Sequence, residues 1–243
     1  MREWQGKRYW LVGASEGLGA ALAHKLSTVG VDLVLSARGE EGLRKLAHSL
    51  PGKAEIAPVD VTDHAALARV AEDIGPVDGV IQMAGVYWPF GAKRWDAEQA
   101  NTMARVNFGG AMALVGTVLP EFVRRDRGHL VMTGSLSGFR GLPDSAPYSS
   151  SKAGVMVLAE SLYADLRKTG VEVQLLNPGF IKTRLTDKND FKMPFLMEPE
   201  EAAQQCFEHM TAGGFKRSFP FGFSLFFRLS QFLPDWLYYR IVS

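Results

Sequence analysis

The sequence has a single cysteine, Cys206, among its 243 residues, so no disulfide can form within the chain. We interpret this cysteine as a small buried hydrophobic residue, and we expect the protein to be in the reducing cytosol. Its five scattered histidines show no metal-ligand spacing, so we predict no metal site. The formal net charge is only +1, which makes a nucleic-acid partner unexpected.

Long apolar runs are also missing. No basic, apolar and small-residue succession follows Met1, so we predict no signal peptide. No stretch approaches the roughly 18 apolar residues of a membrane span, and the longest candidate, 219–227, has about half that length. We therefore expect no spanning helix, although peripheral contact of the C-terminal tail with a membrane remains open.

Short apolar runs alternate along the chain with amphipathic stretches. The runs are 9–13, 31–37, 54–59, 77–84, 129–134 and 171–177. The stretches between them are 18–29, 41–50, 64–74, 96–125 and 149–168. Strands that are apolar on both faces and separated by helices predict one doubly wound parallel sheet, a Rossmann-like α/β fold with helices on both faces. We expect 1–243 to form a single domain with its ligands beyond the carboxyl ends of the strands.

The glycine-rich segment Gly13-Ala-Ser-Glu-Gly17-Leu-Gly19 follows the first predicted strand and begins the first predicted helix. Glycines there allow a tight turn and a close approach of the backbone to a pyrophosphate. The helix N-terminus adds unpaired N–H groups and a partial positive charge. The segment therefore predicts a dinucleotide site, with a plain glycine turn as the alternative.

The spacing Gly-x-x-x-Gly-x-Gly resembles the cofactor loop of the short-chain dehydrogenase/reductase family. Tyr148-Ser-Ser-Ser-Lys152 resembles the catalytic Tyr-x-x-x-Lys pair of that family. Ser135, thirteen residues before Tyr148, stands where the family has its catalytic serine, and Asn107 matches its helix asparagine. The resemblance runs from about residue 6 to about residue 203 and implies catalytic roles for Ser135, Tyr148, Lys152 and Asn107.

The same resemblance implies a set of cofactor contacts. Asp60-Val61 corresponds to the adenine contact, and 177–183 resembles the loop that closes over the nicotinamide. The implied residues are Gly13, Ser15, Glu16, Gly17, Leu18, Gly19, Arg38, Asp60, Val61, Ala84, Gly85, Tyr148, Lys152, Pro178, Gly179, Ile181 and Thr183. The chain departs from the family at Met83, where an asparagine is usual. Methionine cannot make the backbone-bridging hydrogen bonds of that asparagine.

The chemistry of these residues is that of carbonyl reduction. A hydride that reaches a carbonyl carbon leaves an alkoxide that needs a proton, and tyrosine, with a pKa near 10, is a poor acid–base group at neutral pH. Lys152 lies four residues after Tyr148, on the same helix face, so we expect its ammonium to lower the pKa of Tyr148. Ser135 can donate to the carbonyl oxygen, and Ser137 is interpreted as a turn residue. The resemblance implies that Asn107 holds a water between the lysine and solvent.

The cofactor is predicted to be NADP(H). NAD-specific folds place a carboxylate about twenty residues beyond the glycine loop, but this chain has Ala37 and then Arg38. Alanine removes the charge that would repel a 2′-phosphate, and the guanidinium can bind that phosphate bidentately. Glu16 is expected either to repel the phosphate or to pair with Arg38, which would weaken the preference.

Aromatic residues dominate the predicted substrate side. We expect an apolar pocket wall from Tyr87, Trp88, Pro89, Phe90, Phe139, Phe180, Phe191, Phe195 and Met197. Residues 184–198 are predicted to form a lid, and 215–243 an aromatic tail over the pocket, a subunit or a membrane surface. These features favour a reductase of apolar ketones or aldehydes. The alternatives are a 3-oxoacyl-(acyl carrier protein) reductase, for which no attracting basic cluster is evident, and a non-catalytic NADP-binding sensor. We expect a homodimer or homotetramer built on 96–125 and 149–168.

Overall fold

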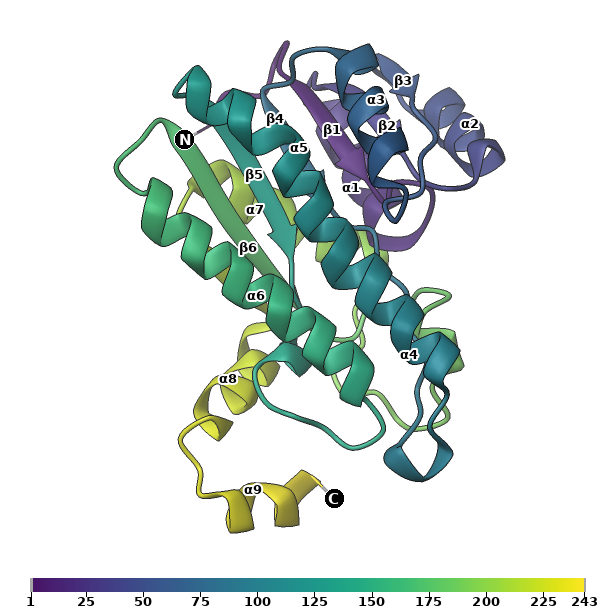
Figure 1. The fold of residues 1–243 in the computed structure, drawn as a ribbon, viewed down its shortest axis with the longest axis vertical. Coiled ribbons are helices and arrows are strands. Elements are labelled where there is room, and N and C mark those ends of the chain that lie inside the picture. The colour runs from purple at the N-terminus through teal and green to yellow at the C-terminus, as the bar shows by residue number, and fades with distance from the viewer. Residues whose placement is uncertain (1, 243) are drawn as a thin grey trace.

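The computed structural model describes residues 2–242, whose central element is a seven-stranded sheet in the order β3-β2-β1-β4-β5-β6-β7 (Figure 1). Every neighbouring pair of strands is parallel. The strands are β1 (Arg8–Val12), β2 (Asp32–Ser36), β3 (Ala54–Ile56), β4 (Gly79–Gln82), β5 (Gly128–Thr133), β6 (Val171–Pro178) and β7 (Lys216–Phe219). The predicted doubly wound α/β fold is confirmed.

Helices cover both faces of the sheet because each buries one apolar stripe against it. One face carries α1 (Gly17–Thr28), α2 (Glu40–Ser49) and α7 (Pro199–Ala212), and Leu22, Leu26 and Leu43 lie in its core. The other face carries α3 (His64–Ile74), α4 (Ala97–Met103), α5 (Gly110–Arg124) and α6 (Ala146–Leu166), in front of the sheet in Figure 1. Because helices cover both faces of the sheet, a ligand can approach the strands only at their ends.

The predicted helix 96–125 is continuous but contains a π-helical segment, η2 (Ala104–Gly109), between α4 and α5. The helix Ala97–Arg124 contains an 18-residue window of mean hydropathy 1.4 and is long and apolar enough for a membrane span, so our expectation that no segment approaches one is wrong. The same properties arise in a core helix, and Leu114 and Val118 of this helix pack in the core against the sheet. We therefore assign it to the core.

Two elements near the C-terminus were not predicted. Helix α7 has signals that could have revealed it, since Pro199 begins it and Gly213 ends it. Strand β7 has none, because Lys216 and Arg217 make it polar, and it is placed by its pairing with β6. The predicted tail 215–243 therefore begins inside the sheet, and only α8 (Phe221–Ser230) and α9 (Asp235–Val242) project from it (Figure 1).

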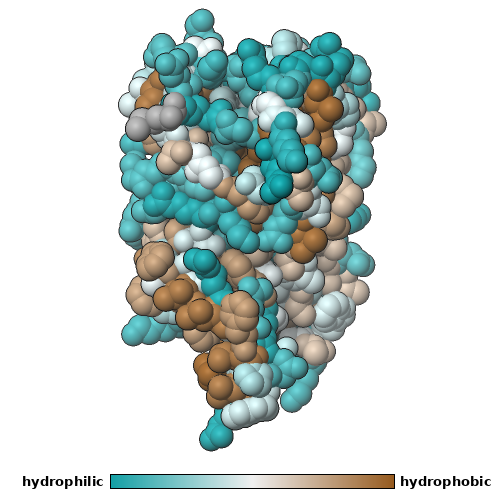
Figure 2. Space-filling model, turned by 90° about the vertical axis from the view of Figure 1, so that its left-hand side faces the viewer, coloured by the Kyte–Doolittle hydropathy of each residue, from teal (hydrophilic) through white to brown (hydrophobic). Residues whose placement is uncertain are grey.

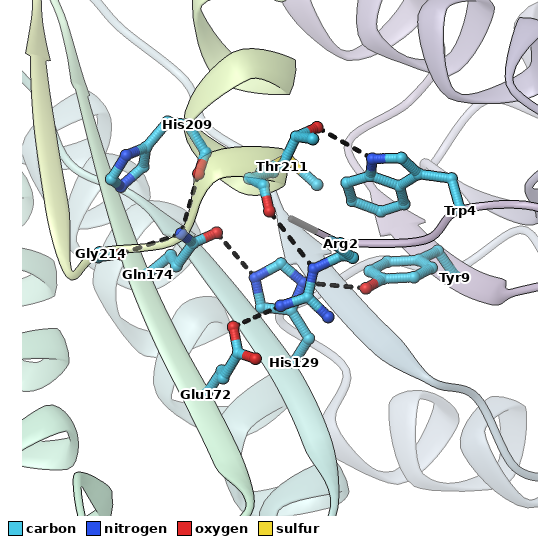
Figure 3. Close-up of polar contacts among 10 residues, drawn as sticks. Arg2, Trp4, Tyr9, His129, Glu172, Gln174, His209, Thr211 and Gly214 are labelled. Atoms are coloured by element: carbon cyan, nitrogen blue, oxygen red, sulfur yellow. Dashed lines mark hydrogen bonds and ion pairs between the residues drawn. The ribbon is translucent and has the colours of Figure 1, made fainter.

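A buried polar network connects strands toward their amino ends (Figure 3). The Tyr9 hydroxyl lies 2.9 Å from His129 Nδ1, and His129 Nε2 lies 2.8 Å from Gln174 Oε1. Gln174 Nε2 donates to the carbonyl oxygens of His209 (3.1 Å) and Gly214 (2.9 Å). Burial lowers the pKa of His129 to about 3, so this imidazole is neutral in the folded protein. The network joins β1, β5, β6 and α7 at the edge of the sheet away from the predicted site.

Candidate active site

A cavity of about 1550 Å³ opens at the carboxyl ends of the strands. This is the edge at which a doubly wound sheet binds its ligands. Every residue predicted to contact the cofactor lines the cavity: Gly13, Ser15, Glu16, Gly17, Leu18, Gly19, Arg38, Asp60, Val61, Ala84, Gly85, Tyr148, Lys152, Pro178, Gly179, Ile181 and Thr183. The fold thus brings together segments that follow each of the strands β1 to β6.

The glycine loop has a geometry that other residues could not adopt. Gly13 has a φ of +94°, and a Cβ there would lie 2.4 Å from the backbone nitrogen of Ala84. Gly17 has a φ of +55°, and a Cβ there would lie 2.8 Å from a methyl group of Thr183. Glu16, the N-cap residue of α1, makes no side-chain capping bond, so no side chain occupies the N–H groups of the first turn. The loop therefore fits the pyrophosphate of a dinucleotide.

Tyr148 on α6 and Ser135 after β5 both line the cavity. Burial raises the pKa of Tyr148 to about 12, although the neighbouring Ser135 hydroxyl acts in the opposite direction. Lys152 Nζ lies 5.9 Å from the centre of the Tyr148 ring and donates to the carbonyl oxygen of Thr133 at 2.9 Å. Burial lowers the pKa of Lys152 to about 8. The predicted lowering of the Tyr148 pKa is therefore wrong for the protein alone, because desolvation dominates.

Ser137 does more than form a turn. Its hydroxyl donates to Ser135 Oγ at 3.0 Å, and its backbone N–H donates to the same oxygen at 3.2 Å. These two donors leave the hydroxyl hydrogen of Ser135 available for another acceptor. Sequence reasoning missed this positioning role, for which the two-residue spacing from Ser135 was the available signal.

Asn107 lies in the π-helical segment, is fully buried and does not line the cavity. Its Oδ1 accepts from the Val86 N–H at 2.7 Å, and its Nδ2 donates to the Val86 carbonyl and to Ser151 Oγ, both at 3.0 Å. The side chain thus fixes the segment after β4 against α6, one residue before Lys152. The predicted water between lysine and solvent stays a prediction.

Gln82 supplies the connection that Met83 cannot make. Its Oε1 accepts from the Thr133 N–H at 3.3 Å, and its Nε2 donates to the Ala84 carbonyl at 2.9 Å. The carboxyl ends of β4 and β5 are therefore bridged by a side chain one position before the family's asparagine. The sequence contains this residue, but only the structure shows where its amide lies.

Arg38 and Glu16 lie on the cavity wall but do not pair with each other. Arg38 is exposed after β2 and makes no ion pair within residues 2–242. Glu16 pairs instead with Arg184 of the predicted lid, with Nε–Oε2 and Nη2–Oε1 distances of 2.7 and 2.9 Å. The expected pairing of Glu16 with Arg38 is therefore wrong, because Arg184 takes both carboxylate oxygens.

The substrate side is only partly the predicted set. Of the predicted aromatic wall, the residues that line the cavity are Tyr87, Pro89, Phe180 and Phe191. Those that pack in or against the cores, or are exposed, are Trp88, Phe90, Phe139, Phe195 and Met197. Leu142 and Pro143 are apolar lining residues that were missed, and the predicted tail 215–243 contributes Phe223, Phe227, Ile241 and Val242, as its pocket-covering alternative expected. Arg94, Asp144, Lys188, Asp190 and Lys192 add charges of both signs.

Comparisons with known proteins show which family the chain resembles along most of its length. The model of the short chain dehydrogenase family matches residues 7–193. The chain is 38% identical to an uncharacterized oxidoreductase of Myxococcus xanthus, over 98% of this chain and 97% of that one. It is also 33% identical to an uncharacterized oxidoreductase of Staphylococcus epidermidis, over 83% and 89% of the two chains.

Two solved structures resemble the fold closely. A short-chain dehydrogenase/reductase of Burkholderia phymatum in complex with NAD has a TM-score of 0.86 at 24% identity, over 95% of this chain and 94% of that one. An actinorhodin polyketide ketoreductase with NADPH has a TM-score of 0.80 at 25% identity, over 92% and 99%. With the family match over most of the chain, these findings show that the protein is an oxidoreductase of the short-chain dehydrogenase/reductase family.

Proposed function

We propose that this oxidoreductase uses NADP(H) to interconvert apolar ketones or aldehydes and the corresponding alcohols. The observation that carries the proposal is the meeting of Ser135, Tyr148 and Lys152 in a cavity with aromatic and aliphatic side chains on its outer wall. A sensor that only bound the cofactor would need the glycine loop but not these three side chains. The expected cytosolic location and homo-oligomeric assembly belong to the same proposal.

The chain's own residues can complete the reduction of a carbonyl. A bound nicotinamide supplies the hydride. Ser135, held by Ser137, donates a hydrogen bond to the carbonyl oxygen and orients it. Tyr148 gives its proton to the oxygen as negative charge develops there, which requires its raised pKa to fall toward working pH. Lys152 Nζ lies 5.9 Å from the centre of the Tyr148 ring, and stabilisation of the phenolate is its proposed part in that fall.

Arg38 supports a preference for NADPH. It follows β2 at the cavity wall, and Ala37 before it carries no carboxylate that would repel a 2′-phosphate. The pairing of Glu16 with Arg184 reduces the negative charge near the same place. Relatives of known structure are described with NAD and with NADPH, so the preference rests on these residues of the chain.

The test is NADPH oxidation by the purified protein with methyl ketones and aldehydes of increasing chain length, beside a 3-oxoacyl substrate on acyl carrier protein. We expect kcat/KM to rise with chain length for the free carbonyl compounds. A rate that is high only for the carrier-bound substrate would contradict the proposed substrate class. Cofactor binding without turnover of any carbonyl would instead indicate the sensor.

A further inference from the structure

Helices α8 and α9 expose an unusual amount of apolar surface. We call it the tail surface, and its members are Phe221, Leu225, Phe226, Leu229, Phe232, Trp236, Tyr239 and Ile241. Phe232 is 84% exposed and Trp236 is 70% exposed. Figure 2 shows hydrophobic atoms gathered at the lower end of the molecule, where Figure 1 places these helices, while the upper part is mostly hydrophilic. Apolar patches of this kind mark binding surfaces.

Helix α8 carries its serines on the inner side and, apart from Arg228, large apolar side chains on the outer side. Ser224 and Ser230 are buried on its inner side, where their hydroxyls donate to the carbonyl oxygens of Phe221 and Phe227, both at 2.8 Å. Its outer side carries Phe221, Leu225 and Leu229 at intervals of four residues. A surface helix normally turns its polar side chains outward and its apolar side chains inward. The arrangement therefore favours an apolar environment around the outer side.

Polar contacts hold the tail in this orientation. The Arg140 guanidinium donates to the carbonyl oxygens of Leu233 (2.8 Å) and Ser230, pairs with Asp235 and lies 4.0 Å from the centre of the Tyr238 ring. The Tyr238 hydroxyl donates to the carbonyl oxygen of Gly141 at 2.9 Å. These bonds fasten the inner side of the tail to the loop after Ser135. The exposed aromatics are thus a fixed feature of the fold.

The charges around the tail surface indicate which kind of partner it binds. Its two arginines, Arg228 and Arg240, are exposed and make no ion pair within the described residues 2–242. Asp235, the acidic residue of this segment, is engaged by Arg140. A second copy packed on the same surface would bring further arginines against Arg228 and Arg240, with Asp235 already paired to Arg140 within each copy. Anionic lipid headgroups would satisfy both arginines, while Trp and Tyr favour the headgroup level of a bilayer.

We propose that the tail surface docks on the interface of a phospholipid bilayer that contains anionic lipid. The apolar side chains of α8 then enter the headgroup and acyl boundary, and Arg228 and Arg240 reach the phosphates. The other sides of the same helices line the substrate cavity through Phe223, Phe227 and Val242. Docking would place the cavity wall beside the lipid. Delivery of an apolar substrate from the lipid rests on the proposed function, whereas docking is independent of it.

Flotation with vesicles tests the docking. Full-length protein is mixed with vesicles of phosphatidylcholine and phosphatidylglycerol in equal parts, and the protein that floats with the lipid is measured. We expect binding of the wild type, and a loss of at least about tenfold in the partition coefficient for the double variant Phe232→Ser/Trp236→Ser. Val123→Ser removes an exposed apolar side chain on another face and should float as the wild type does. Neither Phe232 nor Trp236 lines the cavity, so NADPH binding and thermal unfolding of the double variant show that it is folded.

Fluorescence identifies the residue that enters the lipid. Vesicles with brominated acyl chains should quench part of the tryptophan emission, and Trp236→Phe should abolish that quenching while the protein still floats. Wild type that does not float, or a double variant that floats as well as wild type, would overturn the proposal. So would unchanged quenching in Trp236→Phe. The wild type could instead fail to bind vesicles but form larger oligomers than the double variant. That result would assign the tail surface to contact with a second copy of the chain. Each outcome is independent of which carbonyl the enzyme reduces.

Discussion

The guanidinium of Arg184 binds both carboxylate oxygens of Glu16 and so joins the predicted lid to the cofactor loop. Both side chains are exposed, and an exposed ion pair contributes little to stability, so the connection can open at low cost. The ion pair matters electrostatically, because Arg184 balances the negative charge of Glu16 in the glycine loop. Arg38 is left as the cation that we propose binds the 2′-phosphate of NADPH.

Arg38→Ala should therefore weaken NADPH binding much more than NADH binding. Loss of charged hydrogen bonds to a 2′-phosphate costs about 2–3 kcal/mol, whereas NADH has no group for this arginine to bind. Dissociation constants from cofactor fluorescence measure both effects. Equal weakening for the two cofactors, or a wild type that turns over faster with NADH as judged by kcat/KM, would contradict the interpretation of Ala37 and Arg38.

Tyr148→Phe should reduce kcat by about 10²–10⁴-fold and leave NADPH binding nearly unchanged, because only the proton donor is lost. Ser137→Ala should be measured beside it. This variant keeps Tyr148 but removes the hydroxyl that donates to Ser135, so it should lower kcat by a smaller factor than Tyr148→Phe does. Steady-state kinetics with one ketone measure kcat for both variants and the wild type. More than a tenth of wild-type kcat in Tyr148→Phe would remove this tyrosine from the mechanism.

Gln82→Leu should lower the free energy of unfolding by about 1–3 kcal/mol, because it leaves a buried N–H of Thr133 and a carbonyl of Ala84 without their partner. Urea unfolding at pH 7 measures the loss. Met83→Leu is the matched control, since the Met83 side chain makes no such bridge. If the two variants unfold alike, Gln82 does not join β4 to β5 as described.

His129 should make the protein less stable as the pH falls from about 6.5 to about 3. Its pKa is about 3 when folded and about 6.5 when unfolded, so between these values only the unfolded chain takes up the proton. Full stability from this group is present above about pH 6.5, and the loss is at most about 1.4 kcal/mol per pH unit. His129→Gln keeps a polar side chain but does not titrate. The difference in unfolding free energy between wild type and this variant should thus change between pH 7 and pH 5, and a constant difference would refute the prediction.

The proposed assembly through α5 and α6 gives a further prediction. Val157 on α6 is 60% exposed although it is apolar, which suits burial between subunits. Val157→Glu should convert the oligomer to monomer, because it buries an unpaired charge at the contact. Ala68→Glu, on the exposed side of α3, is the control and should leave the mass by light scattering unchanged. A monomeric wild type at micromolar concentration would exclude the assembly.

Local pattern was sufficient to predict most of the fold, and the family resemblance supplied the proposed set of cofactor residues. Alternation of apolar runs and amphipathic stretches specifies a parallel sheet, since a strand buried on both faces needs a helix on each side. The glycines at 13–19 and the spacing of Tyr148 and Lys152 are constraints within a turn or two of the chain, and Ser135 was placed by the family's spacing, so these residues can be found in the sequence. The residues they predict all line one cavity.

Other properties depend on which side chains meet across long distances in the chain. Arg184 rather than Arg38 pairs with Glu16, Gln82 rather than residue 83 bridges β4 to β5, and β7 exists because β6 pairs with it. The Tyr148 pKa is raised because the whole fold removes water from its hydroxyl. The sequence by itself determined the sheet, the glycine loop and the positions of the proposed reacting groups. Tertiary structure decided their partners, their desolvation and the outward orientation of the tail aromatics, because these depend on packing between segments that local patterns do not connect.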